Sequence, residues 1–534
     1  MKIQYTVNGL YRECEISNDD ILIDVNVTKN RFVYKIKALT NLTLLSVKDT
    51  IPYEINKEDL FFINGYQSWT STREADIDFK ERGVHKFRIL KNIVLNPYGD
   101  YTFYAAKKDR LHSYDVFYVK GKNEIFVLNN NFHNAFLITE LNKKLNRINF
   151  SSDVEGKRLL EGEELIVFDY ERYSSYKEGL EAFNKKYPKK NLPKIFGYTS
   201  WYNYYQNISE SIILRDLEAL DERFDLFQID DGYQTYVGDW KDINKKKFPN
   251  GLKPIVDRIH EKGLKAGLWL APFLAEKNSR LFKEHPDFFK HNAHGEPIKV
   301  GMNWSGPYAL DVTKPKVIKY IEECLKHYVD MGFDFFKLDF IYSPAFIHDG
   351  ITHAEASEAA YKMLQETLKG KIILGCGATL STVYDKFDYV RIGPDISLKF
   401  GGDTLTNTLT REMPSTKVTL LNTIYRNFMN DRWFGNDPDV FLLRDYNIKL
   451  SKEQKRALIT LNALFGSLLL TSDNVGTYDD EKKELLSKAL YLFKNASDVS
   501  FETKGKIIHI TYKLDGNTHE FDYISNKGVM KNGR

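Results

Sequence analysis

The sequence predicts a multidomain α/β protein with a central (β/α)8 TIM barrel, an N-terminal β-sandwich and a small C-terminal antiparallel β domain. Three observations carry this prediction. The first third of the chain alternates apolar and polar residues between closely spaced turn residues, the centre alternates apolar strand-like runs with helical stretches, and the end returns to short alternating runs. We place the sandwich at residues 1–175, a linker helix at 176–193, the barrel at 194–480 and the C-terminal β domain at 481–534.

The N-terminal region carries the alternation of antiparallel strands. Its apolar runs include Phe32–Lys37, Tyr101–Tyr104 and Glu124–Leu128, and Asn, Asp and Gly residues separate them. Residues two apart face the same side of a strand, so the pattern buries one face of each sheet, as in a sandwich. The polar, aromatic loop Asn64–Thr70 interrupts this region, and the simplest role for its Trp69 is to plug one end of the sandwich.

The sequence pattern changes after an amphipathic helix at Tyr176–Tyr187, where the central region begins. Helical spacing in segments such as Pro315–Met331 and Ala354–Leu368 alternates with eight strand-like runs. The expected strands are Phe196–Trp201, Leu226–Asp230, Ala266–Ala271, Phe335–Asp339, Ile372–Cys376, Tyr389–Ile392, Thr419–Thr423 and Ser467–Thr471. Eight such units favour a (β/α)8 barrel, and a doubly wound sheet is the alternative. The run Lys506–Tyr512 near the end of the chain indicates the last β domain.

The composition excludes several classes of function. A formal net charge of +3 over 534 residues gives no reason to expect nucleic acid or an anionic membrane as a partner. No apolar run reaches the ~20 residues of a membrane helix, and the first residues lack the apolar core of a secretory signal. The three cysteines, Cys14, Cys324 and Cys376, are far apart. They argue against a disulfide framework and a zinc site, so we expect a cytoplasmic protein without a cofactor.

Reactive residues gather at the expected carboxyl ends of the barrel strands, where barrel enzymes build their active sites. The fourth strand ends in Lys337-Leu338-Asp339. Residues two apart share a face, so Lys337 and Asp339 point into the same space. A neighbouring cation opposes the pKa rise that burial imposes on a carboxylate, which is the setting of a nucleophile. A strand-end ion pair or a helix cap is the alternative interpretation.

Further carboxylates follow two other strands. Asp395 lies in a Gly-Pro-Asp turn after the sixth strand, and Asp230 and Asp231 end the second. Two carboxylates that flank a bond are the minimal apparatus for glycoside hydrolysis, which makes Asp339 and Asp395 a candidate pair. Asp230 and Asp231 are suited to binding adjacent sugar hydroxyls through charge-assisted hydrogen bonds. Turn aspartates are the alternative for all three.

Other classes of function fit the residues less well. A Schiff-base aldolase would use Lys337, but Asp339 beside it and the lack of a phosphate-binding Gly-rich loop argue against this. A non-catalytic sugar-binding protein is expected to lose one of the two carboxylates, and both are present. A metal site at His348 and His353 has no third ligand at an informative distance.

Taken together, these motifs resemble glycoside hydrolase family 36, the α-galactosidases and their relatives. In chain order the matching motifs are Gly65–Trp69, Ser200–Tyr202, Gln228–Tyr233, Gly238–Trp240, Gly267–Trp269, Phe336–Phe340, Gly375–Gly377, Arg391–Asp395 and Trp433–Asp439. Each motif alone is weak, but the set is specific and spans most of the chain.

The resemblance implies a retaining exo-α-galactosidase that releases terminal α-linked galactose from melibiose- or raffinose-type oligosaccharides. Asp339 is then the nucleophile of a double displacement, and Asp395 is the acid/base. An α-galactosyl transferase, in which a sugar replaces water, is the alternative within the same chemistry. Many bacterial members are longer and carry a tetramer-forming insertion, so no oligomeric state follows for this compact chain.

The resemblance also implies a set of sugar-binding residues. Asp230 and Asp231 would hold the galactose 4- and 6-hydroxyls, and Lys337 and Arg391 would hold ring hydroxyls near the nucleophile. The residues that would shape and close the pocket are Trp69, Trp201, Tyr202, Trp269, Phe340 and Cys376.

Overall fold

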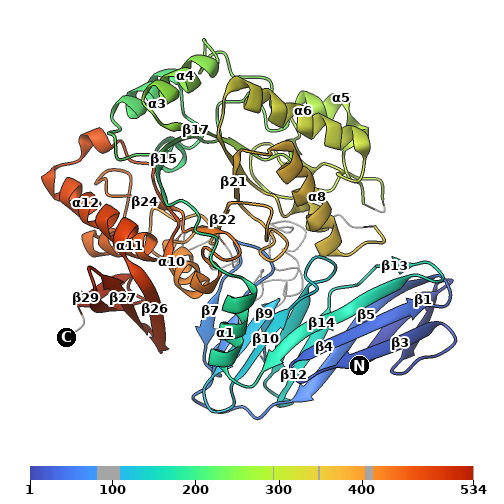
Figure 1. The fold of residues 1–534 in the computed structure, drawn as a ribbon. Helices are drawn as coiled ribbons and strands as arrows, with labels where there is room; N and C mark the ends of the chain where they lie inside the picture. The colour runs from blue at the N-terminus through green and yellow to red at the C-terminus, as the bar shows by residue number, and fades with distance from the viewer. Residues whose placement is uncertain (81–108, 293, 347–348, 403–412, 533–534) are drawn as a thin grey trace.

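The computed structural model describes residues 1–80, 109–292, 294–346, 349–402 and 413–532 (Figure 1). The predicted strand at Tyr101–Tyr104 and the histidine at position 348 lie outside the described residues. Where the chain is described, no helix is long and apolar enough to cross a membrane.

The N-terminal part folds into a sandwich of two antiparallel sheets. The first sheet contains, in spatial order, β2 (Leu10–Cys14), β1 (Lys2–Val7), β5 (Leu42–Pro52), β12 (Arg147–Ser152), β11 (Leu137–Asn142) and β8 (Arg110–Tyr114), with β13 (Arg158–Leu159) against β5. The second contains β3 (Ile21–Val27), β4 (Arg31–Ala38), β14 (Glu164–Tyr173), β10 (Ile125–Asn129), β9 (Val116–Lys120), β6 (Leu60–Ile63) and β7 (Arg73–Ala75). Tyr5, Leu44, Phe117, Val127 and Phe150 are buried in the core between the sheets. The predicted sandwich is confirmed.

A parallel sheet forms the barrel in the centre of the chain. Its strands are, in spatial order, β23 (Gly435–Asp437), β22 (Tyr389–Arg391), β21 (Ile372–Gly375), β20 (Phe335–Leu338), β17 (Lys265–Leu270), β16 (Leu226–Ile229), β15 (Ile195–Thr199), β25 (Leu468–Thr471) and β24 (Val440–Phe441). β23 and β24 are two halves of one strand, separated by Pro438 and Asp439. β23 pairs with β22 and β24 pairs with β25, so this broken strand joins the two ends of the sheet. The predicted barrel is confirmed.

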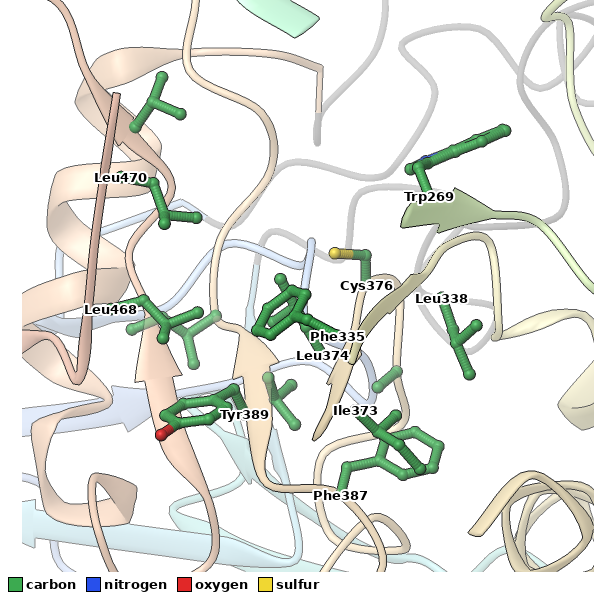
Figure 2. Close-up of a cluster of buried hydrophobic side chains, with 14 of the residues drawn as sticks. Trp269, Phe335, Leu338, Ile373, Leu374, Cys376, Phe387, Tyr389, Leu468 and Leu470 are labelled. Atoms are coloured by element: carbon green, nitrogen blue, oxygen red, sulfur yellow. The ribbon is translucent and has the colours of Figure 1, made fainter. Parts of the chain in front are cut away.

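The core of the barrel is apolar, and helices surround it (Figure 1). Figure 2 shows side chains from several barrel strands gathered in this core, among them Phe335, Leu374, Tyr389 and Leu468. The main helices are α1 (Tyr176–Lys186), α3 (Glu210–Glu218), α4 (Lys253–Glu261), α6 (Pro315–Met331), α8 (His353–Thr367), α10 (Thr416–Tyr425), α11 (Lys452–Phe465) and α12 (Asp480–Asn495). α6 has the predicted bounds, Pro315–Met331. Pro315 suits its first position, and Gly332 caps its end with a φ of 109°, which suits only glycine well.

One of the eight strand predictions is wrong. Thr419–Thr423 lies inside α10, and the seventh strand is the broken pair β23 and β24. The β-branched threonines suggest a strand, but Ser415 caps the helix by accepting the amide of Val418. Most of α10 is buried, so its sequence lacks the polar face that marks a surface helix. The true strand was hidden because Pro438 interrupts it.

The C-terminal part forms a separate antiparallel sheet, as predicted. Its strands are β26 (Ser497–Lys504), β27 (Ile507–Leu514), β28 (Asn517–Ile524) and β29 (Val529–Asn532), paired in that order. This sheet lies next to α10, α11 and α12, on a different side of the barrel from the sandwich sheets (Figure 1).

Candidate active site

A cavity of about 430 Å³ opens at the carboxyl ends of the barrel strands. Its lining residues are Trp69, Trp201, Tyr205, Gln206, Asn207, Asp230, Asp231, Trp269, Asn303, Trp304, Lys337, Asp339, Phe340, Pro394, Asp395 and Pro414. A larger cleft of about 1000 Å³ lies over the first sandwich sheet, but its described lining has no Trp, Tyr or Phe. Of these two, the barrel cavity is the one in which carboxylates and aromatic rings come together, and we take it as the candidate site.

Most of the residues predicted from the sequence meet in this cavity. They are Trp69, Trp201, Asp230, Asp231, Trp269, Lys337, Asp339, Phe340 and Asp395. Three others, Tyr202, Cys376 and Arg391, are 2%, 1% and 1% exposed and lie in the layer behind the cavity wall.

Asp339 follows β20 and is held by two hydrogen-bond donors. The indole Nε1 of Trp269 donates to its Oδ2 at 2.9 Å, and the amide of Phe340 donates to its Oδ1 at 2.9 Å. Phe340 adopts a left-handed φ of 54°, an uncommon conformation that is often found at functional sites. Burial raises the pKa of Asp339 to about 6, Lys337 opposes this rise, and the charge of Asp395 adds to it. Near neutral pH Asp339 is therefore mainly an ionised, oriented carboxylate.

Lys337 is paired differently from the sequence prediction. Its ammonium donates to Oδ2 of Asp230 at 2.8 Å, and both side chains are almost fully buried. Its effect on Asp339 is electrostatic attraction from within the same cavity. Burial alone would lower the pKa of Lys337, but Asp230 overrides this and raises it. Lys337 is thus a permanent cation, which is unsuitable for the neutral amine of a Schiff-base aldolase.

Asp231 also lines the cavity, and hydrogen-bond donors almost fully enclose its carboxylate. Gln206 Nε2 and Trp304 Nε1 donate to its Oδ2 at 2.9 and 2.8 Å, and Gln234 Nε2 donates to its Oδ1 at 2.5 Å. Burial nevertheless raises the pKa of Asp231. Asp230 and Asp231, adjacent in sequence, thus present two differently supported acceptors to the same space.

Several lining residues were missed by the sequence prediction. They are Tyr205, Gln206, Asn207, Asn303, Trp304, Pro394 and Pro414. Trp304 lies in the loop that leads into β19 (Pro307–Ala309). A tryptophan in a polar loop was the available signal, because such a residue is costly to leave in water without a partner.

Trp69 reaches the cavity from the sandwich. Its ring lies edge-on to Phe340 and Tyr342, with centroid separations of 5.2 and 5.6 Å. The simple interpretation of Trp69 as a plug of the sandwich end is therefore wrong, because the residue closes one wall of the barrel cavity.

The loop that carries Trp69 is fastened to the barrel by buried side chains near the end of α10. Arg426, 0% exposed, donates to the carbonyls of Ser68, Ile392 and Thr70 at 2.5, 2.6 and 3.0 Å. Asn422 donates to the Thr70 carbonyl at 2.8 Å. The helix that replaced the predicted seventh strand thus anchors the sandwich loop.

Replacing Arg426 by Met is expected to lower the free energy of unfolding by about 3 kcal/mol, because buried carbonyls lose their donors. Urea titration followed by tryptophan fluorescence measures this. Arg456→Met on the exposed side of α11 is the matched control and is expected to change stability by less than about 0.5 kcal/mol. Equal stability of the two variants would show that Arg426 does not anchor the loop.

Asp395 lies at the cavity mouth, and its side chain is 40% exposed. Arg391 Nη1 donates to its Oδ1 at 3.1 Å. The charge of Asp395 also raises the pKa of Asp339, so the two carboxylates interact electrostatically.

The described residues contain no group of three His, Cys, Asp or Glu side chains arranged to hold a metal. His353 instead pairs with Asp153 of the sandwich at 2.9 Å.

The fold and the cavity define a class: a (β/α)8-barrel protein whose acidic pocket, walled by aromatic rings, lies at the carboxyl ends of the strands. The family model Melibiase matches residues 173–402. The central barrel therefore carries a Melibiase domain, and the resemblance to glycoside hydrolase family 36 is confirmed.

Relatives match parts of the chain. Alpha-galactosidase Mel36A of Lactobacillus acidophilus is 34% identical over 145 residues, 26% of this chain and 19% of that protein. A type blood alpha-D-galactosamine galactosaminidase of Flavonifractor plautii is 34% identical over 147 residues, 25% of this chain and 13% of that protein. These matches thus span less than a fifth of each relative.

One solved structure matches almost the whole fold. It is TtGalA, an alpha-galactosidase from Thermus thermophilus in complex with p-nitrophenyl alpha-D-galactopyranoside, with a TM-score of 0.72. The likeness covers 97% of this chain and 98% of that one, at 23% identity, and so concerns the fold.

Proposed function

We propose that this protein is a retaining exo-α-galactosidase that removes terminal α-linked galactose from oligosaccharides. The observation that carries the proposal is the pairing of Asp339 and Asp395 in one cavity, in different environments. Asp339 is fixed by two donors and partly buried, whereas Asp395 lies at the open mouth beside a guanidinium. The fixed carboxylate suits a nucleophile, and the more exposed carboxylate of Asp395 suits proton exchange with the leaving group and with water.

The first half of the proposed reaction forms a covalent intermediate. An oxygen of Asp339 attacks C1 of galactose, the bond from C1 to the glycosidic oxygen breaks, and Asp395 gives its proton to that oxygen. The product is a β-galactosyl ester of Asp339 and a free aglycone. In the second half Asp395 takes a proton from water as the water oxygen attacks C1. The bond from C1 to the Asp339 oxygen breaks, which frees the Asp339 carboxylate, and the released sugar is α-galactose.

The remaining wall would orient the sugar. Asp230, held by Lys337, and Asp231, held by Gln206 and Trp304, offer carboxylate acceptors for the 4- and 6-hydroxyls. The rings of Trp69, Trp269 and Phe340 supply apolar surface to the faces of the sugar and exclude water around the nucleophile.

Proton NMR of the protein turning over an aryl α-galactoside tests this proposal, with the α-glucoside and the α-N-acetylgalactosaminide as controls. We expect α-galactose as the first-formed anomer and little turnover of the controls. First-formed β-galactose would mean inversion and remove Asp339 as a covalent nucleophile. Preferred turnover of a control would assign the site to a different sugar.

The pH dependence of kcat/KM is expected to show an acidic limb near pH 6. Asp339 must be ionised to attack, and its raised pKa of about 6 means that protonation removes activity below this pH. The same shift affects stability: because folding raises this pKa from 3.8, the contribution of Asp339 to stability is lost as pH rises from about 4 to about 6.

A matched pair of variants tests the origin of that limb. Trp269→Phe removes a hydrogen bond to the ionised Asp339, so the limb should move to higher pH. Trp304→Phe removes a hydrogen bond from the same cavity, but the bond goes to Asp231, so the limb should stay in place. A limb that responds equally in both variants would not belong to Asp339.

A further inference from the structure

Behind Asp395 lies a buried cluster that the proposed mechanism does not use. Arg391, 1% exposed, is its centre. Its Nε donates to Oδ2 of Asp437 at 2.8 Å, its Nη2 lies 2.9 Å from Oδ1 of Asp439, and its Nη1 donates to Asp395. Three carboxylates therefore surround one guanidinium. Burying unbalanced charge is expensive, so the fold retains this arrangement at a cost in stability.

Asp439 occupies an unusual place in this cluster. It lies in the break between β23 and β24, directly after Pro438, and its backbone adopts a left-handed φ of 70°. The break turns its side chain toward Arg391 and the segment that carries Asp395. Burial raises the pKa of Asp439 well above its usual range; Arg391 opposes this, and the charges of Asp395 and Asp437 add to it.

The contacts of Asp439 bracket the candidate acid/base. Its Oδ2 accepts the amide of Ile396, the residue after Asp395, at 2.7 Å, and also accepts the hydroxyl of Tyr202. Its Oδ1 lies beside the guanidinium that donates to the Asp395 carboxylate. The Asp439 carboxylate thus holds the main chain of the turn that carries Asp395. It also holds the guanidinium of Arg391, which contacts the Asp395 side chain.

Asp437 is the natural comparison. It shares Arg391 with Asp439, and its other carboxylate oxygen accepts the Asp439 amide at 2.9 Å. Asp437 therefore contacts the same guanidinium as Asp439. The amide of Ile396, next to Asp395, donates to Asp439.

We propose that Asp439 is a positioning residue that holds Asp395 where it can deliver its proton to the leaving oxygen. The inference rests on the proposed function, because it takes Asp395 as the acid/base. Asp395 lies on a turn at the cavity mouth and has to reach an atom of the substrate. A displacement of about 1 Å at such a group costs on the order of 10²-fold in rate.

The distinguishing readout is dependence on the leaving group. Raffinose has a poor leaving group that needs the proton of Asp395, whereas 2,4-dinitrophenyl α-galactoside leaves without one. Asp439→Asn is expected to lower kcat/KM about 30- to 100-fold for raffinose and at most about 3-fold for the dinitrophenyl substrate. Asp437→Asn, the matched control, should lower the raffinose value by less than about 5-fold.

Each other outcome overturns the inference. Equal losses on both substrates would mean that Asp439 serves the fold or sugar binding, and an unchanged raffinose rate would mean that it has no role in proton delivery. If Asp439→Asn does not fold, Tyr202→Phe removes one donor to Asp439 and is expected to reduce the raffinose rate alone, by about 5-fold. A wild-type protein inactive on both substrates would instead overturn the proposed function, and the inference with it.

Discussion

Asp339→Gly is expected to lose turnover of raffinose by a factor on the order of 10⁴ or more, because no carboxylate remains to attack C1. The loss should fall on kcat, because Asp230, Asp231 and Lys337, the residues proposed to bind the sugar, keep their contacts with one another and with the barrel. Circular dichroism and galactose binding by calorimetry check that the variant folds and still binds. Steady-state kinetics then measure the loss.

Azide gives this prediction a stereochemical control. In Asp339→Gly a small anion can enter the space that the carboxylate left and attack an activated aryl α-galactoside from that side. The expected product is β-galactosyl azide, with partial recovery of rate. If azide restores nothing here but does so in Asp395→Gly with the β product, the roles of the two carboxylates are reversed.

The barrel could be predicted from the sequence because most of its strands are short apolar runs followed by polar residues. The exception is instructive. The seventh strand is broken at Pro438, and Asp437 and Asp439 on either side of the break both contact Arg391. Because these residues are polar, the segment lacks the apolar run by which the other strands were predicted. Local sequence rules failed at the place where the structure departs from regular geometry, which is common at functional sites.

The site was predictable to the extent that it lies at strand ends. Asp230 and Asp339 end predicted strands and Asp395 follows one, and all three carboxylates line the cavity. Pairings across the barrel were not predictable, because strand spacing does not tell which partner a long side chain will choose. Lys337 reaches Asp230 on another strand rather than Asp339 two residues away.

The residues that loops contribute to the cavity were even harder to predict from the sequence. Trp304 and Gln206 support Asp231 from segments whose paths depend on tertiary packing. Trp69 was interpreted from the residues alone as part of the sandwich, and only the family resemblance placed it over the pocket. In the structure, the position of Trp69 depends on Arg426, which donates to the carbonyl of the neighbouring Ser68 although the two residues are far apart in the chain.

Asp395→Gly is expected to separate the two halves of the reaction. For raffinose, kcat/KM should fall on the order of 10³-fold, because the leaving oxygen is no longer protonated. For 2,4-dinitrophenyl α-galactoside the first half should remain fast, while hydrolysis of the intermediate slows because no base activates water. A burst of dinitrophenol, a low KM and a protein mass increased by one galactosyl group would show the trapped intermediate.

Azide distinguishes this variant from the previous one. It needs no general base, so it should attack the β-galactosyl ester of Asp339 directly, speed turnover and yield α-galactosyl azide. The opposite anomers from the two variants follow from one geometry, in which Asp339 and Asp395 act on opposite faces of the same C1. If both variants gave the same anomer, the two carboxylates could not hold separate roles, and the partly buried, doubly hydrogen-bonded environment of Asp339 would need a different explanation.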